Sequence, residues 1–119
     1  MRNAGLDVPP PVLARALIDT GASCTCVDAT VIKKLGLVPS GTASIYTPST
    51  GGNVHTCNQF DVAVGIVMDS NQVHVPSLII PVIESDLDAQ GFQALLGRDV
   101  LNQGIFIYDG HRQFLTLAF

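Results

Sequence analysis

A carboxyl group at the end of an apolar run is the feature of this sequence best suited to chemistry. Asp19 follows the apolar residues 16–18 and is itself followed by Thr20 and Gly21. An ionised carboxylate near a buried strand loses hydration and must be satisfied by hydrogen-bond donors. The threonine hydroxyl and the unobstructed glycine amide can supply these donors in a tight turn. The segment predicts either a reactive carboxyl group or an ordinary Asx turn between two strands.

A second segment, near the C-terminal end, favours the reactive carboxyl group. It consists of two apolar residues, a glycine, a base and an acid: Leu95, Leu96, Gly97, Arg98 and Asp99. Together with the Asp-Thr-Gly-Ala segment at 19–22, it resembles the paired motifs of the retropepsin-like aspartic peptidases, which carry both in this order. The resemblance covers most of the chain, because a short helix, a glycine-tipped hairpin and an apolar C-terminal strand are expected in the corresponding places.

The resemblance implies a mainly β fold, a closed retropepsin-like (acid protease) β-barrel with one or two short helices. It places Asp19 in the catalytic loop. Thr20 would hydrogen-bond its counterpart in a partner subunit, and Gly21 would offer backbone atoms to a bound peptide. The other residues of the implied site are substrate contacts (Ala22, Ser23, Thr50, Gly51 and Gly52) and a structural motif packed beside the loop (Leu95, Leu96, Gly97, Arg98 and Asp99).

Peptide hydrolysis of this kind needs two carboxyl groups, one ionised to take a proton from water and one protonated to donate to the peptide oxygen. No other aspartate of the sequence begins a second Asp-Thr/Ser-Gly segment. Two-lobed relatives that carry both motifs in one chain are much longer than a single domain of this size. The sequence therefore predicts an aspartic endopeptidase built as a homodimer, with the site on the two-fold axis. The alternative is a catalytically silent dimeric peptide-binding or assembly module with the same fold.

Two departures from the family pattern concern Arg98 and the N-terminal segment. Retroviral members often have an acid four places after the catalytic aspartate, paired to the arginine of the second motif. That place is Ser23 here, so Arg98 is left to pair within its own helix or across the dimer. Residues 1–11 end in three prolines and are expected as an extended lead-in rather than a strand. Such an N-terminal segment is expected if the chain is a domain cut from a longer protein. Residues 113–119 are then expected to supply the main terminal strand of the dimer interface.

The remaining pattern predicts one domain over 1–119, made mostly of short strands. A helix is expected over 29–35, because Asp28 suits its N-cap and Gly36 its end. The other expected elements are strands over 12–18, 23–27 and 94–97, a flap hairpin over 42–67 with its tip at 49–53, a turn at 69–71, a strand region over 73–83, a polar loop over 84–91, a helical turn over 98–103, and a hairpin of 105–108 with 114–119.

Composition excludes several classes of ligand. Hydrophobic residues make up 47 % of the 119 residues and charged residues 13 %, against roughly 25 % charged residues in an average soluble protein. A chain this apolar is expected to cover surface with a partner. The net charge is −4 and the basic residues are scattered, so neither nucleic acid nor a membrane surface is an expected partner. The start lacks the order of a signal peptide, and the odd cysteine count fits a reducing, cytoplasmic setting.

Other site chemistries lack the spacing they need. The sulfur and imidazole side chains follow no zinc-ligand pattern, so neither metal nor organic cofactor is predicted: Cys24, Cys26, Cys57, His55, His74 and His111. No nucleophile elbow surrounds Ser23, and no phosphate-binding loop contains Gly51 and Gly52. Cys57 lies on an arm of the expected flap, where it is either an incidental thiol or one whose oxidation gates activity.

Overall fold

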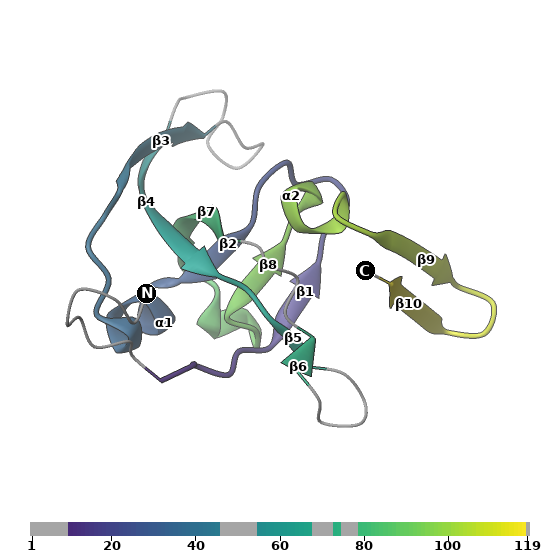
Figure 1. Cartoon of the computed structure of the whole chain (residues 1–119). Coiled ribbons are helices and arrows are strands. Elements are labelled where there is room, and N and C mark those ends of the chain that lie inside the picture. Colours follow the sequence, from purple (N-terminus) through teal and green to yellow (C-terminus); the bar gives the residue numbers. More distant parts are fainter. Residues whose placement is uncertain (1–9, 46–54, 68–72, 75–78, 119) are drawn as a thin grey trace.

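The computed structural model describes residues 10–45, 55–67, 73–74 and 79–118 (Figure 1). Strands predominate in these ranges, which confirms the expected mainly β fold with short helices. No helix in them is long and apolar enough to cross a membrane. The elements are β1 Ala16–Ile18, β2 Cys26–Asp28, α1 Ala29–Leu35, β3 Gly41–Ile45, β4 His55–Ala63, β5 Ile66–Val67, β6 Val73–His74, β7 Ile79–Ser85, the 3-10 turn η2 Asp88–Gln90, β8 Ala94–Leu96, α2 Arg98–Leu101, β9 Ile105–Asp109 and β10 Phe114–Ala118.

Six strands form one mixed sheet in the order β1-β8-β2-β7-β4-β3. β1 runs parallel to β8, so that Ile18 lies opposite Leu96. The sheet ends at β1 on one side and at β3 on the other, so the described strands form an open curved sheet instead of the closed barrel that was expected. A closed barrel needs ladder bonds between its first and last strands. β1 has only three residues and follows a segment with Pro10 and Pro11, which cannot donate such bonds.

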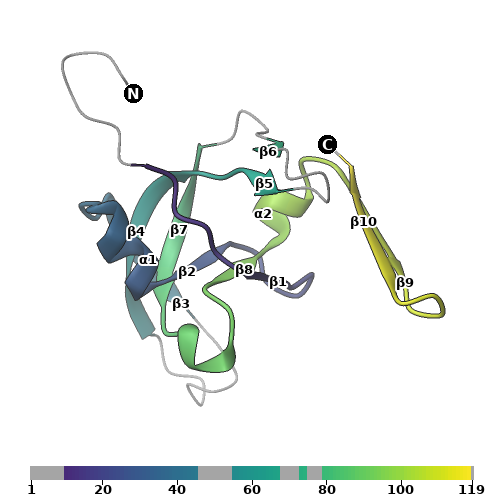
Figure 2. The ribbon, with the colours of Figure 1, turned by 90° about the horizontal axis from the view of Figure 1, so that it is seen from below.

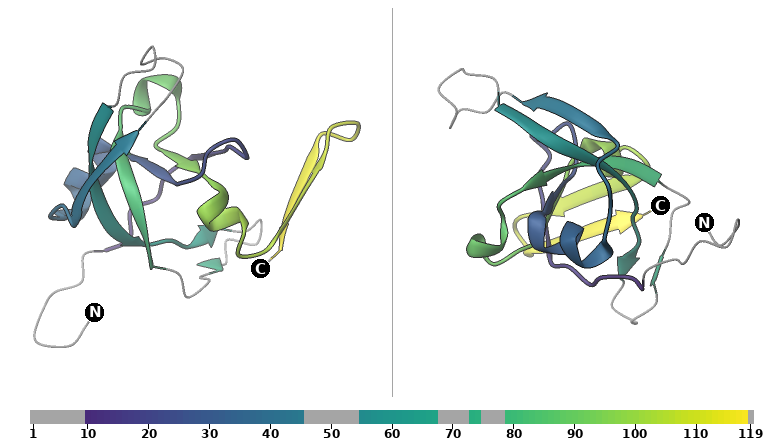
Figure 3. Two further views of the ribbon diagram at one scale, coloured as in Figure 1. Left: turned by 90° about the horizontal axis from the view of Figure 1, so that it is seen from above. Right: turned by 90° about the vertical axis from the view of Figure 1, so that its left-hand side faces the viewer.

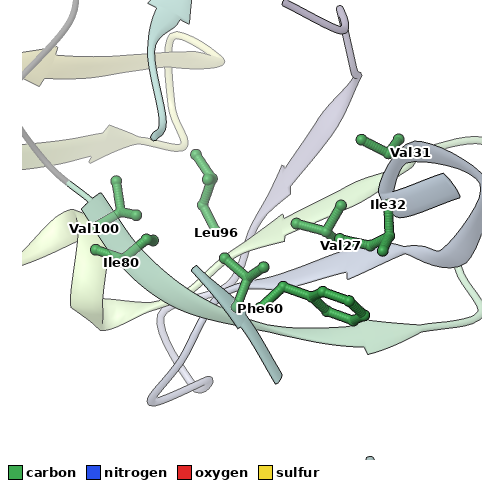
Figure 4. Packing of buried hydrophobic residues seen from close by; sticks show 8 residues of the cluster. Val27, Val31, Ile32, Phe60, Ile80, Leu96 and Val100 are labelled. Atoms are coloured by element: carbon green, nitrogen blue, oxygen red, sulfur yellow. The ribbon is translucent and has the colours of Figure 1, made fainter. Parts of the chain in front are cut away.

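The core is a hydrophobic cluster between the sheet and α1 (Figure 4). Val31 and Ile32 of α1 lie beside Val27 and Phe60 of the sheet, and the cluster continues along the sheet to α2 (Figure 4). Its buried members are Val27, Val31, Ile32, Phe60, Ile80, Val82, Leu96 and Val100. Both motif-bearing segments, β1–β2 and β8–α2, are therefore attached to one packed core.

α1 begins and ends where its capping residues predict. The Asp28 side chain accepts a hydrogen bond from the Thr30 amide, and Gly36 adopts the left-handed conformation with φ of 64°. The Asp28 carboxylate is buried and also accepts bonds from the amides of Leu87 and Asp88, at 2.6 and 2.9 Å. The same side chain thus caps α1 and holds the loop that precedes β8.

Two hairpins extend from this framework. β3 and β4 pair antiparallel, with Ala43 opposite Cys57, which gives the two arms of the expected flap hairpin. Its tip at 49–53, the turn at 69–71 and most of the lead-in over 1–11 lie outside the described residues. The β9–β10 hairpin, predicted from Asp109 and Gly110, is present and projects away from the six-stranded sheet (Figures 1 and 2).

Two predicted strands are shorter or shifted. The strand expected over 12–18 covers only Ala16–Ile18, and the one expected over 23–27 covers Cys26–Asp28. Thr25 does not lie within the second strand because its amide donates to the Asp99 side chain at the start of α2. Of the strand region expected over 73–83, the described residues form β6 and the first part of β7, and β7 continues to Ser85.

Candidate active site

Asp19 lies directly after β1, in a turn held by its own loop. Its amide donates to the carbonyl of Leu96 at 3.0 Å, and its carbonyl accepts from the amide of Ala22 at 3.2 Å. The amide of Gly21 donates to Asp19 Oδ1 at 2.9 Å. The Asp19 side chain is half-buried, whereas Thr20 and Gly21 are exposed. The loop thus presents an oriented carboxylate beside exposed backbone. The hydrogen bond from the Gly21 amide is the one expected of an Asx turn, and the accessible Asp19 side chain is what a reactive carboxyl group needs.

Gly21 and Gly97 both lie at close approaches of the chain. A β-carbon on Gly21 would lie 3.2 Å from Asp19 Oδ1, so a side chain there would crowd the carboxylate. A β-carbon on Gly97 would lie 2.6 Å from the carbonyl carbon and oxygen of Cys24, which no side chain can tolerate without backbone movement. The amide of Arg98 then donates to the carbonyl of Ala22 at 2.8 Å. Glycine at 97 lets the second motif pack directly against the Asp19 loop.

Thr25 is a part of this arrangement that sequence reasoning missed. It is only 1 % exposed, and its hydroxyl donates to Asp99 Oδ1 at 2.6 Å while its amide donates to Oδ2 at 2.9 Å. The same hydroxyl accepts from the amide of Gly97 at 3.1 Å. The sequence held one indication of this role. In an extended segment, the Thr25 hydroxyl points to one face and the Cys24 and Cys26 thiols to the other. Its partner, far away in the sequence, gave no such signal.

The structure also identifies a partner for Arg98. Its Nη1 donates to the carbonyl of Thr20 at 2.9 Å. Because position 23 is a serine and not an acid, Arg98 was expected to pair either within its own helix or across a dimer. The observed bond is neither of these. Arg98 and Ser23 are both exposed. The guanidinium group therefore binds the backbone of the Asp19 loop itself.

The thiols and the buried carboxylate differ in their electrostatics. Burial raises the pKa of the Cys26 thiol and that of Cys57, so neither thiol is activated as a nucleophile. Cys24, Cys26 and Cys57 are all free. Hydrogen bonds from the Thr30 side chain and from the backbone of Leu87 hold the pKa of Asp28 well below its usual range. Asp28 is ionised at any ordinary pH, as a structural group away from the Asp19 loop.

The remaining expected site residues fall into two groups. Ala22 is half-buried and Ser23 is exposed, both in the loop after Asp19. Thr50, Gly51 and Gly52 lie outside the described residues. In the ranges that the structure describes, no group of three or more His, Cys, Asp and Glu side chains is arranged to hold a metal ion.

Comparison with known proteins assigns the class. A model of the aspartyl protease family matches residues 10–100, which contain both motifs. The chain belongs to this family, and its mainly β fold with a single Asp-Thr-Gly segment is of the retropepsin-like kind predicted from the motifs. Among solved structures, it is similar to the retroviral protease-like domain of Ddi1 from Leishmania major, with 20 % sequence identity, a TM-score of 0.44, and coverage of 93 % of this chain and 82 % of that chain. No curated protein matches.

Proposed function

We propose that this protein is an aspartic endopeptidase, in which Asp19 and the Asp19 of a second copy activate the attacking water. The observation that carries the proposal is the bond from the Gly21 amide to Asp19 Oδ1, which orients one carboxylate oxygen in an otherwise accessible loop. Membership of the aspartyl protease family supports it independently.

The reaction needs both carboxyl groups at once, and two like charges held together share one proton. The ionised carboxylate takes a proton from water as the water oxygen attacks the peptide carbonyl carbon. The protonated carboxyl group donates its proton to the carbonyl oxygen. The tetrahedral gem-diol intermediate then collapses as the peptide C–N bond breaks. The carboxyl group that took the proton from water donates it to the leaving nitrogen, and the other carboxylate takes a proton from a hydroxyl group of the gem-diol, which restores the pair. These steps use no metal or organic cofactor.

The β9–β10 hairpin supports the homodimer, because its apolar side chains are exposed on both of its faces. Ile105, Ile107 and Phe114 share one face by register and are 63 %, 54 % and 69 % exposed. Tyr108 and Leu115 lie opposite each other on the other face, 74 % and 53 % exposed. A two-stranded hairpin standing alone is marginal in water. Burial of this hairpin against a second copy would stabilise it and bring in the second Asp19.

We further propose how the substrate is held. A peptide in extended conformation would lie over the Asp19 loop, with Ala22 and Ser23 on one side and the flap on the other. The antiparallel β3–β4 arms would form the base of that flap, and Thr50, Gly51 and Gly52 would close over the peptide. Peptides with apolar side chains at the cleaved bond are the expected substrates. We also propose that residues 1–119 form one domain. The three free thiols favour a reducing, cytoplasmic setting for it.

A peptide-library digest tests this function. The wild-type protein should cleave members of the library, a statine-type inhibitor should block cleavage, and Asp19→Asn should cleave none while keeping the same oligomeric state. Undiminished cleavage by Asp19→Asn would exclude the mechanism. Peptide binding without cleavage by the wild-type protein would instead assign the chain to the silent peptide-binding module.

A further inference from the structure

Arg98 makes two hydrogen bonds to the Asp19 loop, one on each side of Gly21. Its Nη1 donates to the Thr20 carbonyl at 2.9 Å, and its amide donates to the Ala22 carbonyl at 2.8 Å. The first of these bonds is charge-assisted, because the guanidinium group stays protonated at all relevant pH values.

The Thr20 carbonyl and the Gly21 amide belong to one planar peptide unit. The Gly21 end of that unit donates to Asp19 Oδ1 at 2.9 Å. A donor that fixes the carbonyl end therefore also fixes the direction of the N–H group at the other end. Hydrogen bonds in such a chain polarise one another, so the cation at Thr20 also makes the Gly21 amide a stronger donor.

The helix that carries Arg98 is itself firmly anchored. The next residue, Asp99, is bound by both the hydroxyl and the amide of Thr25. Val100, which follows, is completely buried in the core. Because α2 is fixed by these contacts, the Arg98 side chain restrains the exposed loop and not the reverse.

We infer that Arg98 is a positioning residue for Asp19, acting through the Thr20–Gly21 peptide. The inference rests on the proposed function, since it assigns Arg98 a part in orienting the reactive carboxylate. It also gives the guanidinium group a role that does not depend on an acid at position 23, where this sequence has Ser23. A purely structural Arg98 would affect only the amount of folded protein.

The experiment compares the wild type with Arg98→Ala, Arg98→Lys and Lys34→Ala, the last removing one positive charge from the exposed end of α1. Amide exchange of Gly21 is measured in each folded protein. It should be faster in Arg98→Ala by roughly tenfold or more, as expected when a local restraint is lost, and unchanged in Lys34→Ala. Arg98→Lys, which keeps a charged donor, should fall between the two, and it serves alone if Arg98→Ala does not fold.

Kinetics on the same proteins separate positioning from folding. For equal amounts of dimer, Arg98→Ala should lose roughly tenfold or more in kcat with little change in KM, since small misplacements of reacting groups have effects of this size. Millimolar guanidinium ion should restore part of the kcat of Arg98→Ala only. Wild-type Gly21 exchange in both Arg98 variants would overturn the inference, as would wild-type kcat per dimer. If the wild type cleaves nothing, the proposed function fails and the exchange measurement alone decides the role of Arg98.

Discussion

The carboxylate of Asp99 binds the Thr25 hydroxyl at 2.6 Å and the Thr25 amide at 2.9 Å, which ties α2 to the segment that follows the Asp19 loop. Thr25 is almost completely buried, and its hydroxyl also accepts from the Gly97 amide. Removing this hydroxyl would leave the Gly97 amide and one oxygen of Asp99 without that partner. A buried polar group that loses its hydrogen bond costs about 1–3 kcal/mol.

Thr25→Val is therefore expected to lower the free energy of unfolding by about 2 kcal/mol. Urea denaturation, followed by circular dichroism, measures the change. The matched control is Thr42→Val on the exposed β3 strand, where a surface substitution should stay within about 0.5 kcal/mol. Equal unfolding free energies for the two variants would show that the Thr25–Asp99 pair does not stabilise the fold.

Gly97→Ala should be among the most damaging single substitutions in this chain. The added methyl group would lie 2.6 Å from backbone atoms of Cys24, so either β8–α2 or the loop after Asp19 has to move. Overpacking that forces the backbone to shift typically costs about 1–3 kcal/mol, and a contact this short places Gly97→Ala at the upper end of that range. Gly41→Ala is the control, because nothing lies within 4 Å of the added carbon there. Thermal unfolding of both variants measures the difference, and a folded Gly97→Ala protein as stable as Gly41→Ala would contradict the close packing of the two motifs.

Asp28 predicts a specific dependence of stability on pH. Hydrogen bonds from Thr30, Leu87 and Asp88 hold the pKa of Asp28 below its ordinary value of 3.8. A lowered folded-state pKa contributes stability above the unfolded pKa, and this contribution is lost as pH falls from about 4 toward the folded value. Asp28→Asn should thus cost about 2–3 kcal/mol at pH 7, and the difference from wild type should shrink below about pH 4.

Denaturant titrations of wild type and Asp28→Asn between pH 7 and pH 3 measure this effect. Asp61→Asn, on the exposed face of β4, should stay within about 0.5 kcal/mol of wild type at pH 7. A constant stability difference between wild type and Asp28→Asn across the range would mean that the charge of Asp28 is not what stabilises the α1 cap.

The β9–β10 hairpin predicts the effect of charge on assembly. Phe114→Lys places an ammonium group on the apolar hairpin face that, by register, also carries Ile105 and Ile107. The hairpin stands apart from the six-stranded sheet (Figure 3). Burying that charge in an interface is unfavourable, so the variant should sediment as a monomer at concentrations where the proposed wild-type dimer is expected. His111→Lys adds the same side chain in the turn and should leave the mass unchanged. A Phe114→Lys protein with wild-type mass would remove the hairpin from the interface.

Features that depend on neighbouring residues were predictable from the sequence. The helix over 29–35 needed only Asp28, Gly36 and its apolar spacing, and it occurs with those bounds. The C-terminal hairpin was indicated in the same way, although its turn extends to Gln113, which adopts a positive φ of 58°. The paired motifs likewise indicated the family correctly.

Features that depend on distant pairs were not predictable. The hydrogen bonds that join Thr25 to Asp99 and Arg98 to Thr20 link residues 74 and 78 positions apart. Side-chain identity alone does not reveal such partners, because many donors could satisfy the same acceptor. Nor does a strand pattern fix the order β1-β8-β2-β7-β4-β3 or the position of β1 at the edge of the sheet that the described strands form. For this reason the sequence predicted the mainly β class correctly, whereas the described strands do not show the closure of the expected barrel.

The most direct test of the central claim is the stoichiometry of inhibitor binding. If one site is made from two Asp19 carboxyl groups, calorimetric titration with a statine-type inhibitor should give one inhibitor bound per two chains. Asp19→Asn should form the same dimer and lose most of that binding. One inhibitor per chain, or undiminished binding by Asp19→Asn, would contradict a site shared between two copies.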